Sequence, residues 1–178
     1  VTSGRVAHQR TAAAPLEVRS TAAAWDGDKL VFWTSNQVPQ GVKGVLGPLY
    51  AETATGGGQV IVPDVGGGFG AKIAAYPEDV LLPWLAQKIG RPMRWFEPRT
   101  ENMQAMGPGR AHVHRFTLGG SADGNLTHYR LEVLVDSGAY ARLGAFLPMF
   151  TLPMTTGVYE IASVETSALS VITNTTPT

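Results

Sequence analysis

The sequence predicts an α+β fold in which mixed sheets pack against helices. Residues 126–135 alternate apolar and polar side chains, which is the pattern of a strand with one buried face. Residues 77–89 form an apolar-rich segment that begins at a proline and stops before Gly90, which is typical of a helix. Strand-like and helical segments alternate along the rest of the chain without internal repeats, and together they indicate this fold class.

In the first part of the chain, a strand is expected at residues 29–33, after a turn at residues 25–28. A helix is predicted over residues 38–52, although glycines and Pro48 weaken it, and residues 53–58 form a loop. A further strand at residues 59–62 leads into a glycine-rich turn.

The helix over residues 77–89 is expected to bury one apolar side, made of Val80, Leu81, Trp84, Leu85 and Ile89. Pro83 should kink it or delay its start. The acidic pairs Glu78/Asp79 and Glu97/Glu101 are interpreted as solvated charges beside helix starts.

The remaining elements follow from local signals. A strand is predicted at residues 93–97 and a short helix at 100–106. Residues 112–118 and 126–135 form a hairpin around Asp123-Gly124, because that dipeptide favours a tight turn. A last strand spans residues 164–172.

Composition bounds the function without naming it. The 178 residues are 44% hydrophobic, so the chain can bury a core, and we expect one partial domain over residues 1–178. Its 14 basic and 14 acidic residues give no net charge, so the composition does not indicate binding to nucleic acid or to anionic membranes. No apolar stretch is long enough to suggest a membrane span. The absence of cysteine excludes disulfides and any iron–sulfur cluster held by this chain.

The most informative motif is a glycine-rich turn over residues 66–72, with the sequence Gly-Gly-Gly-Phe-Gly-Ala-Lys. Its uncovered amides allow close approach of an anionic or oxo group. A phosphate loop does not fit, because Ala71 separates Gly70 from Lys72 and Ile73 replaces the hydroxyl residue. A dinucleotide fingerprint fits the glycine spacing, but the helix begins too late, so this reading stays as an alternative.

The wider string Val65 to Lys72 resembles the signature turn of the molybdenum-binding subunit of the xanthine dehydrogenase, aldehyde oxidase and carbon monoxide dehydrogenase superfamily. Further segments resemble the family in the same order, and they are residues 9–17, 33–39, 90–95, 136–140 and 173–175. The resemblance implies a piece of a molybdenum-hydroxylase large-subunit domain.

The resemblance also implies roles for individual residues. Gln37 would hydrogen-bond an oxo ligand of molybdenum, and the turn residues Gly67, Gly68, Phe69 and Gly70 would bind the cofactor. Phe69 and Arg110 would border the substrate pocket. The metal would be held through the pterin, with no direct protein ligand.

No catalytic residue is expected within the chain. The family's base glutamate would lie beyond Thr178, so the chain alone is expected to be inactive.

Ile73 stands where purine-oxidising members carry a glutamate, and an isoleucine makes no such hydrogen bond. The string therefore resembles the carbon monoxide dehydrogenase branch most. The substrate, oxidised with water as the oxygen source, could be carbon monoxide, an aldehyde or an N-heterocycle, and Ile73 favours the first two. The implied cofactor is molybdenum-molybdopterin, in the cytosine dinucleotide form. Iron–sulfur and FAD centres would belong to partner subunits in a cytoplasmic dimer of heterotrimers. The competing hypothesis is a non-catalytic fragment that retains the fold.

Two weaker readings concern polar side chains. His112 and His114 share one strand face, and with His128 on the neighbouring strand they could hold zinc, although no carboxylate or cysteine accompanies them. Lys72 is expected to be a solvated charge beside the turn.

Overall fold

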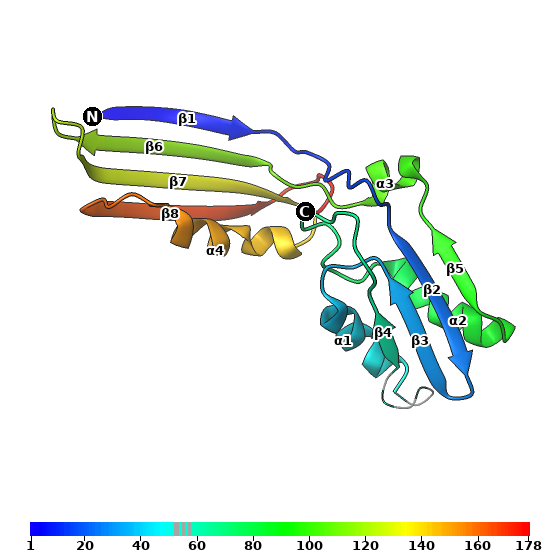
Figure 1. Ribbon diagram of the computed structural model, residues 1–178. Coiled ribbons are helices and arrows are strands. Elements are labelled where there is room, and N and C mark those ends of the chain that lie inside the picture. Colours follow the sequence, from blue (N-terminus) through cyan, green and yellow to red (C-terminus); the bar gives the residue numbers. More distant parts are fainter. Residues whose placement is uncertain (52–53, 55, 57) are drawn as a thin grey trace. The chain divides into compact units, whose positions relative to one another are not determined.

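A computed structural model describes residues 1–51, 54, 56 and 58–178. Within these residues the strands form two four-stranded sheets, one in each of two compact units (Figure 1). The terminal unit consists of Val1–Ala12 and Gly107–Thr178, and the central unit is Ala13–Met106. The predicted α+β class with mixed sheets is confirmed, and the single domain over residues 1–178 stays a prediction.

The terminal unit is a sheet with the strand order β1-β6-β7-β8. These strands are β1 (Thr2–His8), β6 (His112–Gly120), β7 (Leu126–Gly138) and β8 (Ser163–Ile172). The pairs β1–β6 and β6–β7 are antiparallel, whereas β7 and β8 are parallel. A parallel pair needs a crossover, and the helical turns η2 (Leu143–Phe146), α4 (Leu147–Thr151) and η3 (Leu152–Met154) supply it (Figure 1).

The predicted hairpin is present, and its strands extend further than expected. The alternation along β7 is also confirmed, since Leu131, Val133 and Val135 are buried and pack against Leu147 of α4. The intervening residues of β7 are more exposed. This side of the sheet therefore carries the core of the terminal unit.

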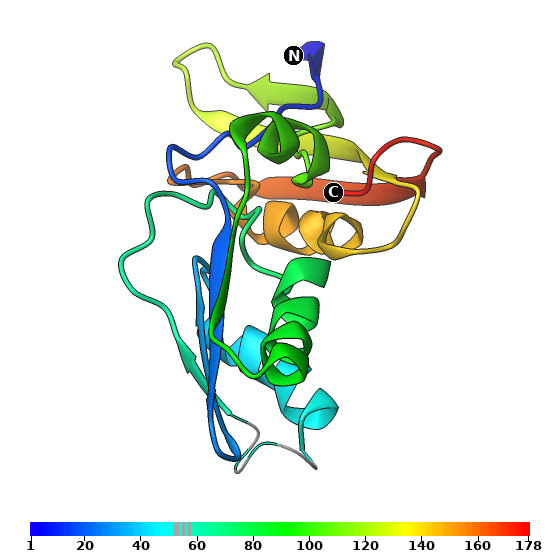
Figure 2. The same cartoon turned by 90° about the vertical axis from the view of Figure 1, so that its right-hand side faces the viewer.

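The central unit is a smaller sheet with the order β4-β3-β2-β5. Its strands are β2 (Ser20–Asp26), β3 (Lys29–Thr34), β4 (Gln59–Ile61) and β5 (Met93–Phe96). Its helices are α1 (Pro39–Leu49), α2 (Pro77–Ile89) and α3 (Arg99–Ala105). Figure 2 shows α1 and α2 on the same side of these strands, where Phe32, Val42 and Leu82 form part of one buried cluster.

Local signals determined the helix ends well. Helix α2 has the predicted bounds, and Gly90 ends it in the left-handed conformation (φ 66°) that favours glycine. Pro83 lies inside α2 without delaying its start. Helix α1 ends at Leu49 instead of residue 52, directly after its breakers, and residues 53, 55 and 57 of the predicted loop 53–58 lie outside the described residues.

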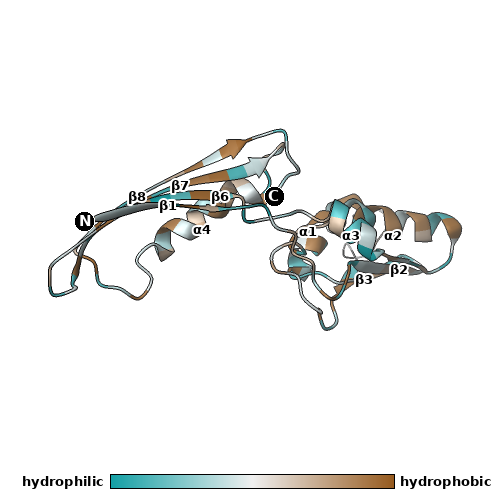
Figure 3. Cartoon of the chain, turned by 90° about the horizontal axis from the view of Figure 1, so that it is seen from above, coloured by the Kyte–Doolittle hydropathy of each residue, from teal (hydrophilic) through white to brown (hydrophobic). Residues whose placement is uncertain are grey.

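The predicted buried side of α2 was wrong. Its buried residues are Asp79, Leu82, Pro83 and Ala86, whereas Leu81, Trp84 and Ile89 are about half exposed. Hydrophobic residues recur along α2 (Figure 3), and those on its exposed side, such as Leu81 and Ile89, are as apolar as the buried Leu82, so the sequence pattern could not identify the buried side. Strands β1 and β2 and the helical turns of residues 143–154 were not predicted.

Within the described residues, no helix has both the length and the apolar character needed to cross a membrane.

The end of β7 is tied to the last residues of the chain through Asp136. Its carboxylate accepts hydrogen bonds from the Thr173 hydroxyl at 2.6 Å and the Gly138 amide at 2.9 Å, and it pairs with Arg10 at 2.8 Å. The Thr173 hydrogen bond, together with Arg10 and Gly138, outweighs the opposing effect of burial and lowers the pKa of Asp136 from 3.8 to about 2.

Because the folded pKa is lowered, this stabilisation is present above pH 4 and is lost as the pH falls toward 2. We expect Asp136→Asn to lower the free energy of unfolding by about 1–2 kcal/mol at pH 7 and to flatten its dependence on pH between 4 and 2. Urea unfolding at pH 7 and at several pH values between 4 and 2 measures the free energy of unfolding and its pH dependence. The exposed Glu160→Gln is the control, and an unchanged acid dependence in Asp136→Asn would contradict the assignment.

Candidate cofactor site at the glycine turn

The glycine turn follows β4 and precedes α2, and its backbone is held in conformations that few side chains tolerate. Gly67 and Gly70 have φ of 100° and 90°, which glycine adopts without cost. Phe69 also has a positive φ of 52°, and its ring is 73% exposed. A bulky residue in the left-handed region costs conformational energy, and such strain is common at functional sites.

The side chain of Gln37 lies against this turn. Its Oε1 accepts hydrogen bonds from the backbone amides of Gly70 (3.1 Å) and Lys72 (3.2 Å), and the backbone amide of Gln37 donates to the Lys72 carbonyl at 2.8 Å. Because both neighbours of Oε1 are N–H donors, the side-chain amide has its oxygen toward the turn. The structure thus brings together two segments that the sequence could connect only through the resemblance.

Several N–H donors at this turn have no intramolecular partner. In the part of the chain that the structure describes, no acceptor pairs with the amides of Gly67, Gly68 and Phe69, or with Nε2 of Gln37. Consecutive unpaired amides form a concave group of donors that suits an anion or an oxo group. The donor set therefore fits a cofactor that presents anionic oxygen atoms.

Gly68 is required for the seating of Gln37. A Cβ atom on Gly68 would lie 2.3 Å from Oε1 and 2.5 Å from the Cδ of Gln37, which is closer than real Cβ contacts. Any side chain here would displace the glutamine. Glycine at this position is thus explained by close approach, whereas Gly67 and Gly70 are explained by their φ angles.

Lys72 is not the solvated charge that the sequence predicted. Its side chain is 1% exposed, and its Nζ donates to the Glu17 carboxylate at 2.6 Å and to the Glu17 carbonyl at 2.9 Å. A buried ammonium needs such partners because its desolvation is costly. Lys72 is therefore part of the buried framework that supports the turn.

The dinucleotide reading has no support in the geometry. A fingerprint of that kind requires a helix that opens within the glycines, with the helical amides directed at the pyrophosphate. Helix α2 instead begins at Pro77, and none of the residues from Gly66 to Lys72 is helical.

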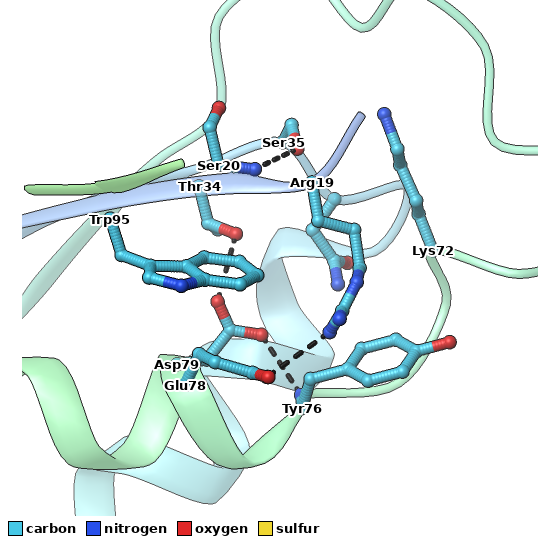
Figure 4. Close-up of a pocket in the computed structure, with 10 residues that line it drawn as sticks. Arg19, Ser20, Thr34, Ser35, Lys72, Tyr76, Glu78, Asp79 and Trp95 are labelled. Carbon is cyan, nitrogen blue, oxygen red and sulfur yellow. Dashed lines mark hydrogen bonds and ion pairs between the residues drawn. The ribbon is translucent and has the colours of Figure 1, made fainter. Parts of the chain in front are cut away.

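Beside the turn lies a small polar cavity of about 10 Å³, shown in Figure 4. This volume holds about one water molecule, so the cavity is too small for a cofactor. At its centre the Arg19 guanidinium lies 3.8 Å from the centre of the Tyr76 ring and pairs with Glu78 at 3.1 Å. It also binds Glu97, whose carboxylate accepts from Arg19 Nε at 3.0 Å and from Asn102 at 2.7 Å.

The acidic residues Glu97 and Asp79 are buried, so the interpretation as solvated charges was wrong for both. Burial alone would raise the pKa of Glu97, but the hydrogen bonds from Arg19 and Asn102 outweigh it and hold the pKa below its ordinary value. Burial raises the pKa of Asp79, and hydrogen bonds from the Tyr76 amide and the Thr34 hydroxyl oppose this only in part. Asp79 caps α2, and Glu97 neutralises Arg19.

Arg110, the second residue predicted to border a substrate, belongs to the terminal unit, whereas Phe69 belongs to the central unit. Arg110 is exposed and has a φ of 76°, the same unusual conformation as Phe69. It follows Gly109, which forms a pair of backbone hydrogen bonds with Thr11.

The zinc reading was wrong because the histidines do not share a face. His112 and His114 lie opposite Val135 and Val133, on the buried side of the sheet, whereas His128 lies opposite Gly119 and points to the other side. No group of potential metal-ligating side chains occurs in the described residues. Burial, together with the neighbouring His114, lowers the pKa of His112, which favours its neutral form.

Sequence reasoning missed the residues that support the turn. Glu17 and Arg19 come from the segment before β2, and their partners lie 55 and 78 residues further along the chain. No local pattern identifies such pairs.

A turn of unpaired amides beside a side-chain amide, on a mixed α+β unit, suits an oxygen-rich anionic ligand. The family model of the molybdopterin cofactor-binding domain matches residues 1–178, and the chain belongs to this family. It is a molybdenum-cofactor-binding segment of a large subunit of the xanthine oxidase type, as the motifs predicted.

Individual relatives support the family assignment. The chain is 36% identical to the nicotine 6-hydroxylase large subunit of Paenarthrobacter nicotinovorans over 94% of its length and 21% of the relative. It is 31% identical to the carbon monoxide dehydrogenase large chain of Hydrogenophaga pseudoflava, covering 92% of this chain and 21% of that one. The chain thus spans about a fifth of the length of these curated relatives.

The fold is shared with solved structures. The crystal structure of quinoline 2-oxidoreductase from Pseudomonas putida 86 superposes with a TM-score of 0.86 at 29% identity, over 99% of this chain and 23% of the other. A copper- and molybdenum-containing carbon monoxide dehydrogenase gives a TM-score of 0.81 at 27% identity, over 99% of this chain and 22% of that one.

The polar network around Arg19 generates a stability prediction. Arg19→Leu leaves the fully buried Glu97 without its cation, and we expect it to cost about 3–5 kcal/mol. The double variant Arg19→Leu/Glu97→Leu should cost less, because no buried charge remains unpaired. Chemical unfolding of both variants measures this, with the exposed Arg91→Leu as the control. A double variant that is less stable than Arg19→Leu would contradict the account.

Proposed function

We propose that this chain is the part of a molybdenum-hydroxylase large subunit that holds the molybdopterin cofactor at Gln37 and the turn residues Gly67, Gly68, Phe69 and Gly70. One observation carries the proposal. The unpaired amides of Gly67, Gly68 and Phe69 lie in the turn whose Gly70 and Lys72 amides hold the Gln37 side chain with its Nε2 free. Family membership identifies the cofactor that such donors would bind.

In this proposal the chain provides hydrogen bonds and no direct metal ligand. Gln37 Nε2 and the free amides donate to anionic oxygen atoms of the cofactor, and Gly70 contributes by holding Gln37 through its own amide. When bound, a molybdenum cofactor supplies the two-electron acceptor for hydroxylation with water. Fixed donors of this kind stabilise developing charge without reorganisation, and each is typically worth about 3 kcal/mol.

The proposed substrate is carbon monoxide or an aldehyde, with Phe69 as a substrate-facing residue. Ile73 supports this, because its side chain cannot hydrogen-bond a purine. An N-heterocycle is a second candidate, favoured by the similarity to a nicotine hydroxylase subunit and a quinoline oxidoreductase. Assays of the complete enzyme with carbon monoxide, aldehydes, nicotine and quinoline separate the candidates.

The finer features of the assembly are also proposals. The cofactor would be the cytosine dinucleotide form, and iron–sulfur and FAD subunits would accept the electrons in a cytoplasmic dimer of heterotrimers. The base glutamate would lie beyond Thr178. Relatives named as large chains and as a complex subunit support an assembly of several subunits.

The direct test of the proposed function is the molybdenum and pterin content of the purified full-length complex. We expect about one molybdenum and one pterin per large subunit, because the donors at the turn have no other partner. A complex free of metal and pterin would overturn the proposal and leave a non-catalytic member of the family.

The donor assignment predicts the effect of Gln37→Leu. This change keeps approximate size and removes the Nε2 donor, so turnover per bound molybdenum should fall about a hundredfold. Gly68→Ala should reproduce that loss, since its Cβ displaces the Gln37 side chain. The double variant should be no worse than Gln37→Leu alone.

The control for Gly68→Ala is Gly47→Ala, because a Cβ on Gly47 meets no atom within 4 Å. We expect it to retain full turnover per metal. Full turnover in Gln37→Leu would show that this amide does not act on the cofactor.

A further inference from the structure

Glu17 contacts both ends of the glycine turn through one carboxylate oxygen. Its Oε2 accepts hydrogen bonds from the Gly66 amide at 3.0 Å, at the start of the turn, and from Lys72 Nζ at 2.6 Å, at its end. The Glu17 amide also donates to the Gly66 carbonyl at 3.1 Å. The turn is therefore closed across its ends by a residue 55 positions away from Lys72.

The Lys72 ammonium has a fixed direction. Its three donor hydrogens are matched by three acceptors, which are the Glu17 carboxylate, the Glu17 carbonyl and the Val18 carbonyl at 3.5 Å. The side chain is 1% exposed, whereas Glu17 is 30% exposed. Removing Glu17 would leave a buried cation with carbonyl partners only, a situation that forces it to move toward water.

The main chain of Lys72 transmits this constraint to Gln37. The Lys72 amide donates to Gln37 Oε1, and its carbonyl accepts from the Gln37 amide. A displacement of Lys72 therefore moves the side chain whose Nε2 is free. It also moves the Gly70 amide, which shares Oε1 with Lys72.

We propose that Glu17 and Lys72 are positioning residues that hold the donors of the turn and Gln37 in place for the cofactor. We call this pair the Glu17–Lys72 clamp. The inference rests on the proposed function for what the donors bind, but the clamp itself is a property of the chain. Misplacing a group of the active site by about 1 Å commonly lowers the reaction rate about a hundredfold. The clamp can therefore affect the rate without contacting the substrate.

The packing at Gly66 gives the clamp an independent signature. A Cβ atom on Gly66 would lie 2.6 Å from the Cβ of Glu17. Gly66→Ala should therefore push Glu17 away and reproduce the effects of Glu17→Gln, although it changes no charge. Gly47→Ala is again the matched control.

The first measurement is hydrogen exchange on the cofactor-free full-length large subunit. In Glu17→Gln and Lys72→Met, the Gly66, Gly70 and Lys72 amides should exchange about tenfold faster or more, whereas α2 should keep its protection. The control is Glu101→Gln, an identical change at an exposed carboxylate of the same unit. Unchanged exchange in both variants would overturn the clamp.

The second measurement is made on the loaded complex. We expect turnover per bound molybdenum to fall about tenfold to a hundredfold in Glu17→Gln with little change in KM. We also expect the electron paramagnetic resonance signal per metal to shift, because the donors around it have moved. A merely structural role would lower yield and metal content and leave both quantities per metal unchanged, and that result would overturn the positioning role.

The two measurements separate the clamp from the proposed function. If the parent complex contains no molybdenum, the proposed function fails, and the exchange experiment still decides whether Glu17 and Lys72 hold the turn. Both proposals are supported if three results hold. The parent complex contains molybdenum, the amides of the turn exchange faster in the variants, and Glu17→Gln shifts the electron paramagnetic resonance signal and lowers the turnover per metal.

Discussion

The geometry of the candidate site depends on one oxygen atom, Oε1 of Gln37. It accepts the amides of Gly70 and Lys72, and this choice leaves the Nε2 group of the same side chain free to donate outward. Were the side-chain amide reversed, two N–H donors would face an NH₂ group and all would lose their partners. The turn therefore determines which atoms of Gln37 a ligand can meet, and Gln37 in turn holds the end of the turn.

This arrangement is embedded in a framework of buried charges. Lys72 and Arg19 are both almost fully buried, and each is matched by a carboxylate from a distant segment, Glu17 and Glu97 respectively. Such pairs contribute little net stability compared with apolar residues of the same shape. Removing one partner is nevertheless strongly destabilising, because it leaves a buried charge without a counter-charge. Their value here is directional, because each charge accepts only one arrangement of its hydrogen-bond partners. The polar interior thus fixes the loop that a purely apolar core would leave free to shift.

The features of the fold that the sequence predicted correctly are those set by residues close together in the chain. Pro77 and Gly90 bound α2, and the alternation around Leu131 identified the buried face of β7, because caps and period-two patterns act within a few residues. Local signals could not show that Lys72, Glu97 and Asp79 are buried, since each has a partner in a distant segment, which is Glu17, Arg19 and Thr34 respectively. The contact between Gln37 and the turn was equally invisible to spacing, and the resemblance alone supplied it. The buried side of α2 was mistaken because both of its sides carry apolar residues.

The glycines of the turn are required for different physical reasons, and together these requirements specify the conformation of the turn. Gly66 and Gly68 are needed because a Cβ would strike Glu17 and Gln37 respectively, whereas Gly67 and Gly70 have positive φ angles. A flexible linker would impose none of these conditions. Among residues 66–70 only Phe69 carries a side chain, and it does so at a conformational cost and with that side chain largely exposed. Since the ring adds little to the core of its own unit, the strain is best understood as the cost of presenting an aromatic surface beside the free amides, where a substrate of the proposed enzyme would be bound.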